Sequence, residues 1–272
     1  TGKKFMRETD ARILIDRRLR EADWDIENKN QVSTEETSQN GRADYILKDS
    51  RGRAIAVIEA KRFSVDPASA KQQALSYAES INAGFIFLSN GEDIYFWDYK
   101  YRPEQKVATF FSQRDLEKIQ TLRLEQKPLS AIPVPEKYYK GGEWRSPRPD
   151  QKEAMQIMDK ALEGGKRKML LVMATGTGKT DTIALYLKRL FEAGLANRAL
   201  FLVDRIDLGV QTKEVFDEIL TDYPSKLLYG GKQRDESSII ISTLPTLYSQ
   251  LSLFTSGYFD VIISDEAHRS IF

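Results

Sequence analysis

Hydrophobic and polar positions change their pattern about halfway along the chain. In the first half, the apolar spacing of residues 6–19 predicts an amphipathic helix, and the Ala- and Gln-rich residues 68–81 predict another. Runs of β-branched and aromatic residues, with turn signals between them, predict strands at residues 43–47, 55–60, 85–88 and 94–97. Helices and strands interleaved in this way predict a mixed α/β domain.

In the second half, apolar strand-like runs alternate with helical stretches. The pattern predicts a helix at residues 180–191 and strands at residues 169–173, 199–203, 239–242 and 261–264. Such alternation is typical of βα units that build a parallel sheet. Pro and Gly concentrate in residues 127–149, which is typical of a linker on the surface. We therefore expect an α/β chain with domains at residues 1–126 and 150–272.

Composition narrows the classes of function. The chain has 272 residues, no cysteine and one histidine, His268, which excludes disulfide scaffolds, thiol nucleophiles, Cys-based zinc sites and mechanisms with two imidazoles. Because the formal charge is +1, any DNA contacts must come from local clusters of basic residues and not from the net charge. The basic run at residues 166–168 is more simply a solvated turn. Trp24, Trp97 and Trp144 are expected to be core or staple residues. Without a membrane-length apolar run or a signal-peptide core, we expect a reducing cytoplasm and no membrane contact.

The strongest motif is Ala-Thr-Gly-Thr-Gly-Lys-Thr at residues 174–180, after an apolar run and at the start of a predicted helix. Glycines let backbone N–H groups approach phosphate oxygens, and the helix N-terminus adds a favourable dipole. Lysine supplies charge, and the last threonine offers a hydroxyl to Mg²⁺. A Gly/Thr-rich helix cap is the alternative, and Met173 stands where the general pattern has its first glycine. The motif predicts a nucleotide-phosphate site built from Thr175, Gly176, Thr177, Gly178, Lys179 and Thr180.

A second motif, Asp265-Glu266-Ala267-His268, follows the apolar run at residues 261–264. Asp265 at the end of a buried parallel strand can hold Mg²⁺ beside a phosphate loop. Glu266 is then placed to take a proton from the attacking water. An acidic pair after a strand is usually a helix cap when it stands alone, but the phosphate motif upstream favours a nucleotide site.

Together these motifs resemble motifs I and II of superfamily-two helicases and translocases. Residues 148–151 resemble the Q motif of that family, in which Gln151 would recognise the adenine edge. Residues 202–211 and 242–246 resemble motifs Ia and Ib, which line the nucleic-acid backbone in the family. Each of these three would by itself be a solvated loop, but their order and spacing match the family. The resemblance implies a RecA-like lobe that uses ATP and Mg²⁺.

Four residues follow His268, so motifs III to VI and the second RecA-like lobe are missing from this sequence. The resemblance implies that the second lobe supplies an arginine finger. We therefore expect the 272-residue chain by itself to bind ATP weakly and to hydrolyse it slowly.

A different set of charged residues occurs on the strands predicted in the first half. Asp44 lies on one strand, while Glu59 and Lys61 lie on the next and, by alternation, on the same face. A hairpin can bring the two carboxylates and the ammonium group together, and carboxylate oxygens are ligands for Mg²⁺. Such a metal can activate water at a phosphodiester, with Lys61 at the nucleophile or the developing oxyanion. An ordinary charged hairpin is the alternative.

This arrangement resembles the core of PD-(D/E)XK nucleases, although Ala43 replaces the proline of the family name. Gln73 and Tyr77, four residues apart on the next predicted helix, match the Gln-x-x-x-Tyr element of one branch of that superfamily. Glu8 resembles the acid of the family's first helix, although an acid in a first helical turn is commonly a partner of the helix dipole. The resemblance implies that Asp44, Glu59, Lys61, Gln73 and Tyr77 form the catalytic centre.

A PD-(D/E)XK nuclease followed by a superfamily-two motor resembles the restriction (R) subunit of type I restriction–modification enzymes. The resemblance implies ATP-dependent translocation of double-stranded DNA with Mg²⁺-dependent cleavage, in a bacterial or archaeal cytoplasm. It also implies methyltransferase and specificity subunits as partners. Two alternatives remain open: another fusion of a nuclease with such a motor, type III-like or a repair translocase, and a module that binds DNA and nucleotide without turnover.

Overall fold

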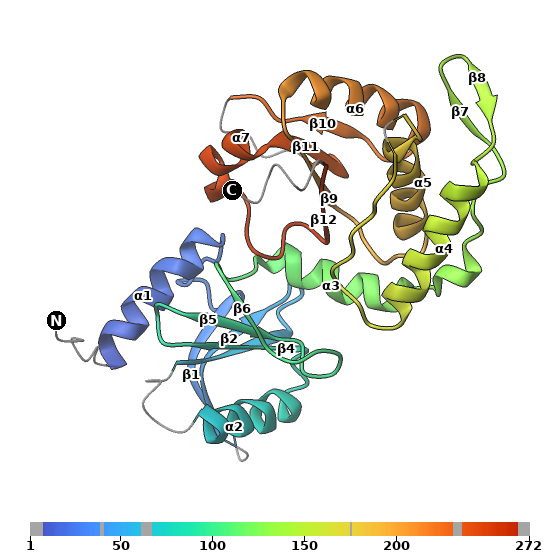
Figure 1. Ribbon diagram of the computed structural model, residues 1–272. Coiled ribbons are helices and arrows are strands. Elements are labelled where there is room, and N and C mark those ends of the chain that lie inside the picture. The colour runs from blue at the N-terminus through green and yellow to red at the C-terminus, as the bar shows by residue number, and fades with distance from the viewer. Residues whose placement is uncertain (1–7, 39–40, 61–66, 175, 231–235, 266–272) are drawn as a thin grey trace. The chain divides into compact units, whose positions relative to one another are not determined.

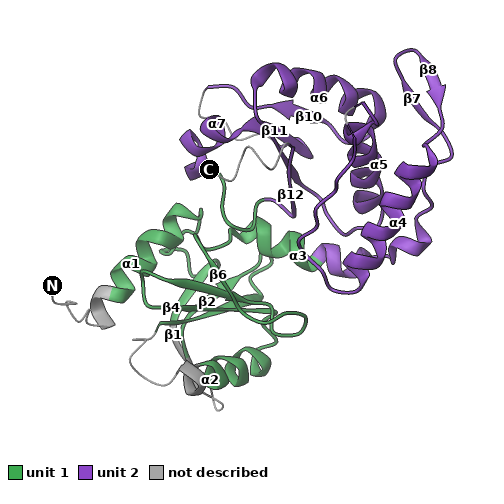
Figure 2. Ribbon diagram, in the orientation of Figure 1, with its two compact units in different colours: residues 1–120, 254–258 green, residues 121–253, 259–272 purple. Residues whose placement is uncertain are grey.

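The computed structural model describes residues 8–38, 41–60, 67–174, 176–230 and 236–265 (Figure 1). The chain divides into two compact units, which Figure 2 colours separately. Unit 1 contains residues 1–120 and 254–258, and unit 2 contains residues 121–253 and 259–272. None of the described helices is long and apolar enough to cross a lipid bilayer.

Unit 1 is built around a six-stranded mixed sheet. Its elements in chain order are α1 (Glu8–Glu21), β1 (Val32–Ser38), β2 (Gly41–Lys48), β3 (Ala54–Ala60), α2 (Pro67–Ser80), β4 (Phe85–Ser89), β5 (Ile94–Trp97), β6 (Gln105–Val107) and α3 (Gln113–Glu125), which continues into unit 2. The strands follow one another in sequence order across the sheet. Neighbours are antiparallel except β3 and β4, which are parallel because α2 connects them as a crossover.

Both faces of this sheet are buried, which explains why β3 is apolar at every position except Glu59. One face carries Ile58 and Phe87 and packs against Leu19 of α1 and Leu116 of α3. The opposite face carries Val57 and packs against α2, which Figure 1 shows along the sheet. The predicted helices at residues 6–19 and 68–81 and the four predicted strands of this half are confirmed.

The sequence analysis missed β1 and β6, the two edge strands of the sheet. Their sequences, Val-Ser-Thr-Glu-Glu-Thr-Ser and Gln-Lys-Val, are mostly polar and lack the apolar alternation of a strand with a buried face. Polar and charged residues are common on edge strands, where they discourage pairing with another chain. These strands are therefore recognised from their pairing with β2 and β5 and not from their own composition.

A short segment from far along the chain, residues 254–258, completes unit 1. Ser256 Oγ accepts a hydrogen bond of 2.9 Å from the Thr109 amide. Lys118 Nζ donates to the carbonyl oxygens of Gly257 at 2.9 Å and Tyr258 at 2.8 Å. A Cβ atom on Gly257 would lie 2.6 Å from the ring of Phe111, so a glycine is needed for this close approach.

Unit 2 is built around a parallel four-stranded sheet in the order β10-β11-β9-β12. Its elements are η1 (Leu129–Ala131), β7 (Tyr138–Lys140), β8 (Glu143–Arg145), α4 (Pro149–Glu163), α5 (Lys179–Glu192), β9 (Ala199–Val203), α6 (Ile206–Ile219), β10 (Ser225–Leu227), β11 (Ile239–Thr243), α7 (Leu244–Ser249), η2 (Leu251–Leu253) and β12 (Val261–Ser264). The predicted α/β class, the parallel sheet and the helix at residues 180–191 are confirmed, and the short strand β10 was missed.

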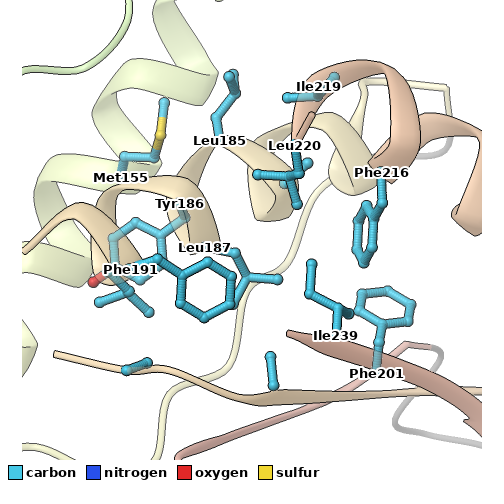
Figure 3. Close-up of a cluster of buried hydrophobic side chains, with 14 of the residues drawn as sticks. Met155, Leu185, Tyr186, Leu187, Phe191, Phe201, Phe216, Ile219, Leu220 and Ile239 are labelled. Carbon is cyan, nitrogen blue, oxygen red and sulfur yellow. The ribbon is translucent and has the colours of Figure 1, made fainter. Parts of the chain in front are cut away.

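The core of unit 2 lies between the helices and the central strands (Figure 3). Leu185 and Phe191 of α5 and Phe216 of α6 are buried together with Phe201 of β9 and Ile239 of β11. The rings of Phe201 and Phe216 meet edge to face, with 5.2 Å between their centroids. Strands buried in this way explain the continuous apolar runs of β9 and β11.

The strand predicted at residues 169–173 is wrong. These residues form no strand, and the side chains of Leu170 and Val172 are 79% and 82% exposed. Both sides of β9 are occupied, by β11 and β12, and residues 169–173 pair with no strand of the described sheet. An apolar run states only a preference for burial, and in the described sheet this run pairs neither with the inner strands nor with the outer strands β10 and β12.

Residues 127–149 contain more structure than a surface linker. Leu129 is fully buried, and β7 and β8 form an antiparallel hairpin. Arg189 of α5 is 2% exposed and donates to the carbonyl oxygens of Leu129 and Ile132, at 3.1 and 2.8 Å. Trp144 of the hairpin is 69% exposed and so is not a core residue, whereas Trp24 of unit 1 is buried in the core.

Candidate active sites

The two predicted carboxylates of unit 1 lie on adjoining strands, next to the point where the pairing of β2 with β3 ends. The antiparallel ladder ends with Tyr45 opposite Ile58, so Asp44 and Glu59 are the next positions on the two strands. Residues opposite each other in such a pair have Cβ atoms about 5 Å apart. Asp44 and Glu59 are both buried, with 9% and 5% of their surface exposed. Both predicted carboxylates are therefore buried on adjoining strands, and their meeting at one metal ion stays a prediction.

Both oxygens of Asp44 have defined partners. Oδ2 accepts a hydrogen bond of 2.8 Å from the amide of Ala60, the residue after Glu59. Oδ1 lies 2.8 Å from a guanidinium nitrogen of Arg12 in α1. Tyr45, the next residue of β2, donates from its hydroxyl to Asp16 of α1 at 2.8 Å. Burial raises the pKa of Tyr45 above its ordinary value, and the bond to Asp16 adds to this rise.

Helix α2 covers the face of β3 on which Glu59 lies. By strand alternation Glu59 shares this face with Val57, and Val57 belongs to the same buried cluster as Tyr77 of α2. Gln73, one turn earlier on α2, is exposed. The structure therefore places Gln73 and Tyr77 on the helix next to the carboxylates, and their catalytic roles stay predictions.

Other predicted residues of this site cannot be placed. Lys61 lies outside the described residues, and so does the side chain of Glu8, although α1 begins at that residue. Within the described part of the chain, no group of three or more His, Cys, Asp or Glu side chains is arranged around one point. Two carboxylates on adjoining strands are hard oxygen donors, so Asp44 and Glu59 fit a divalent cation such as Mg²⁺, with other ligands from backbone or water.

In unit 2 the phosphate motif forms a turn that leads directly into α5. Gly176 and Gly178 have positive φ angles of 75° and 77°, which glycine adopts without strain. The side chain of Thr177 donates to the Ala174 carbonyl oxygen at 2.5 Å and closes the turn. Lys179 and Thr180 are the first residues of α5, where the backbone N–H groups and the helix dipole favour an anion. Thr175 lies outside the described residues.

The Q-motif glutamine contacts this turn from α4. Gln151 is 1% exposed, and its Nε2 donates to the Gly178 carbonyl oxygen at 3.1 Å. Its Oε1 accepts from the Arg148 amide at 2.9 Å, which caps the start of α4. A Cβ atom on Gly178 would lie 2.6 Å from Gln151 Nε2, so a larger residue at Gly178 would push the Gln151 amide away from the turn. Recognition of adenine by Gln151 stays a prediction.

The motif segments that follow the strands of unit 2 lie at the carboxyl ends of these strands. Because β9, β11 and β12 are parallel, their carboxyl ends meet at the same edge, where open α/β sheets bind ligands. Arg205 follows β9, Thr243 ends β11 and caps α7, and Asp265 follows β12. The Asp265 amide donates to the Leu202 carbonyl oxygen at 2.9 Å, which continues the pairing with β9. Glu266 and His268 lie outside the described residues.

A pocket of about 710 Å³ adjoins the phosphate turn. Ala174 and Thr177 of the turn border it, Asp150 and Ile157 line it from α4, and the residues 169–173 line it from the other side. Its volume lies in the range of small-molecule sites, which is large enough for a nucleotide base.

Two known families match consecutive parts of the chain. Residues 7–112 match the family described as the N terminus of the type I restriction enzyme R protein, and residues 145–272 match the family described as the res subunit of type III restriction enzymes. The endonuclease subunit of the Escherichia coli type I restriction enzyme EcoAI is 31% identical over 84% of this chain. The chain belongs to the type I restriction enzyme R-subunit family.

Two further proteins resemble this R-subunit chain. The EcoKI endonuclease subunit of Escherichia coli (strain K12) is 25% identical over 96% of the chain. The chain spans 29% of the length of the EcoAI subunit and 29% of the EcoKI subunit. The fragment structure of a Vibrio vulnificus chain named as the HsdR subunit of a type I restriction enzyme is 26% identical over 97% of this chain and 52% of its own, with a TM-score of 0.39.

The sequence analysis missed the residues that anchor the phosphate turn of this R-subunit chain. Asp181 follows Thr180 and is 5% exposed. It accepts hydrogen bonds from the Tyr138 hydroxyl at 3.0 Å and from Lys140 Nζ at 2.5 Å, both on strand β7. Burial, together with the Asp181 carboxylate, raises the pKa of Tyr138 from 10.0 to about 12. An acid just after a phosphate motif was a usable signal, but its partners lay in a segment that was expected to be a linker.

Proposed function

We propose that this chain carries the DNA-cleaving centre and one ATP-binding lobe of a type I restriction subunit. The observation that carries the proposal is the pair of buried carboxylates, Asp44 and Glu59, on adjoining strands of unit 1. An acidic pair buried beside a backbone amide is unfavourable for stability unless it binds a cation or a hydrogen-bond donor. The family membership of residues 7–112 supports a function in restriction.

In the cleavage centre, Asp44 and Glu59 hold a divalent cation by their carboxylate oxygens. When bound, Mg²⁺ lowers the pKa of a water molecule and offsets negative charge on the phosphodiester. The Ala60 amide fixes one oxygen of Asp44, so that the carboxylate is oriented before the metal arrives. Lys61 stabilises the developing negative charge, and Gln73 and Tyr77 orient the ligands from α2.

In the ATP-binding lobe, the turn at residues 174–180 holds the triphosphate. Gly176, Thr177 and Gly178 present backbone N–H groups, and Lys179 contacts the β- and γ-phosphates. Thr180 and Asp265 hold Mg²⁺, and Glu266 takes a proton from the attacking water. Gln151 binds the adenine edge, which would couple recognition of the base to the position of Gly178.

The names of the relatives support the rest of the proposal. Both Escherichia coli relatives are named as endonuclease subunits of type I restriction enzymes. We infer double-stranded DNA as substrate, methyltransferase and specificity subunits as partners, and the cytoplasm as location. The description of residues 145–272 as a type III res subunit supports the alternative of a type III-like fusion, and the match at residues 7–112 favours type I.

The decisive experiment uses the full-length subunit assembled with its partner subunits. Glu59→Gln keeps the shape of the side chain but removes its charge, so DNA cleavage should fall by at least about a hundredfold while DNA-stimulated ATP hydrolysis continues. The matched control is Glu79→Gln on the exposed face of α2, which should cleave at the normal rate. Normal cleavage by Glu59→Gln, with an unchanged melting temperature, would show that Glu59 is not part of the centre.

A further inference from the structure

We propose that Arg12 is a positioning residue that weakens metal binding at Asp44 until a DNA phosphate takes over its guanidinium group. The proposal rests on the proposed function, because it assigns a metal to Asp44 and a phosphodiester to the space beside it. It adds a cationic residue from α1 to a centre whose other members come from β2, β3 and α2.

The contact between Arg12 and Asp44 is close and sheltered. A guanidinium nitrogen lies 2.8 Å from Asp44 Oδ1, and the two side chains are 29% and 11% exposed. The helix that carries Arg12 is fixed to the same strand, because Tyr45 donates to Asp16 one turn further along α1. Ile15 and Leu19 of α1 are fully buried against the sheet. Arg12 is therefore held at Asp44 by the packing of its helix.

The two oxygens of Asp44 have different partners, and this affects how a metal ion can bind. Oδ2 accepts the Ala60 amide, and Oδ1 faces Arg12. A divalent cation that binds Asp44 must share the carboxylate with the guanidinium or displace it. An arginine stays protonated at any pH at which the protein is folded, so this positive charge cannot be removed by deprotonation. Repulsion between the two cations therefore weakens metal binding in the absence of DNA.

A phosphodiester reverses this effect. The planar guanidinium presents paired donors that fit a phosphate, and the phosphate brings the negative charge that Asp44 otherwise supplies. Once Arg12 binds the phosphate, Oδ1 becomes available to the metal. By linkage, DNA must then strengthen metal binding by the same factor by which metal strengthens DNA binding at this centre. Metal and substrate would thus bind together and only weakly alone.

The test measures metal affinity in the full-length subunit, without nucleotide, by titration with Mn²⁺ and detection of the free ion by electron paramagnetic resonance. Asp44→Asn identifies the relevant Mn²⁺ ion by its loss. Arg12→Gln should bind this ion about fivefold or more tightly than the wild type without DNA. A short duplex should tighten Mn²⁺ binding in the wild type but not in Arg12→Gln.

The matched control is Arg17→Gln, which removes the same charge from an exposed position of the same helix and should leave Mn²⁺ affinity unchanged. Arg12→Lys keeps the charge but not the paired donors. It should therefore bind Mn²⁺ like the wild type without DNA, and show a smaller gain when DNA is added. This variant also tests the proposal if Arg12→Gln does not fold.

Two results would overturn the proposal in different ways. Equal or weaker Mn²⁺ binding by Arg12→Gln, with Asp44→Asn still removing the ion, would refute the role of Arg12 and leave the metal centre intact. Undiminished Mn²⁺ binding by Asp44→Asn would refute the metal centre itself, and with it the proposed cleavage function. A melting curve of each variant separates either result from loss of the fold.

Discussion

The carboxylates of unit 1 and the phosphate turn of unit 2 are held in place by different means. Asp44 and Glu59 lie on two strands of a sheet whose faces are both covered, and the strand register sets their separation. The phosphate turn has no such support from the residues before it, since Leu170 and Val172 are exposed and outside the sheet. It is held by α5, which follows it, by Gln151 of α4, and by the hydrogen bonds of Asp181 with β7.

This difference shows that two candidate sites in one chain can depend on different kinds of structural support. A site placed by strand register depends on the core, because moving one strand by one residue turns every side chain to the other face. A site placed by a helix start depends on a few polar contacts around that start. Core substitutions should therefore damage the first site, and polar substitutions at the edge of α5 should damage the second.

The largest expected effect concerns the phosphate turn itself. Lys179→Ala in the full-length subunit should lower ATP hydrolysis by about a hundredfold to a thousandfold, because a charge on the β- and γ-phosphates is lost. Lys160→Ala, at an exposed lysine of α4, is the control and should change the rate little. A steady-state ATPase assay measures both. Normal turnover in Lys179→Ala would break the comparison, because the turn would then not be a phosphate site.

The second prediction compares two apolar runs by their contribution to stability. Ile58 is fully buried in β3, so Ile58→Ala should lower the free energy of unfolding by about 2–5 kcal/mol. Leu170 is 79% exposed, so Leu170→Ala should change it by less than about 0.5 kcal/mol. Urea denaturation of the 272-residue chain gives both values. A large loss for Leu170→Ala would mean that residues 169–173 are buried in solution.

The third prediction concerns the polar anchor of the turn. Asp181→Ala removes the acceptor of Tyr138 and the ion-pair partner of Lys140, and should cost about 1–3 kcal/mol of stability. Asp207→Ala, which breaks an exposed ion pair with Arg205 on α6, should cost less than about 1 kcal/mol. Chemical denaturation measures both. Equal costs would show that the contacts of Asp181 do not anchor the turn.

The smallest expected effect is a loss of stability at alkaline pH. Folding raises the pKa of Tyr138 above its ordinary value of 10.0, to about 12. Its contribution to stability is therefore complete below pH 10 and is lost as the pH rises towards 12, with a slope of at most about 1.4 kcal/mol per pH unit. Tyr138→Phe should lack this component. Thermal unfolding from pH 9 to 11 compares the two proteins, and identical slopes would contradict the burial of the hydroxyl.

The positions of Asp44 and Glu59 on adjoining strands could be predicted because the information for them is local. The alternation of residues 55–60 and the turn at residues 49–52 predict a hairpin that brings the strand of Asp44 alongside the strand of Glu59, with no knowledge of the rest of the fold. Helical spacing likewise put Gln73 and Tyr77 on one side of α2. Arg12 could not be found in this way, because its contact with Asp44 joins residues 32 positions apart and depends on how α1 packs.

The failures in the second half have a common cause. An apolar run such as residues 169–173 states a preference for burial, but the strand order decides which runs find a neighbour. The residues that anchor the phosphate turn could not be predicted because their local sequence does not indicate folded structure. Tyr138 and Lys140 lie among prolines and glycines that are typical of a linker, and only the folded hairpin brings them to Asp181.

The segment at residues 254–258 affects when unit 1 can finish folding during synthesis. Domains usually fold from the N-terminus as the chain leaves the ribosome. Here the contacts of Ser256 with Thr109 and of Gly257 with Lys118 join residues 147 and 139 positions apart. Phe111 and the adjoining face of α3 therefore stay without their final cover until most of the second sheet has been synthesised. Unit 1, although most of it is encoded first, is therefore completed only after most of unit 2 has been synthesised.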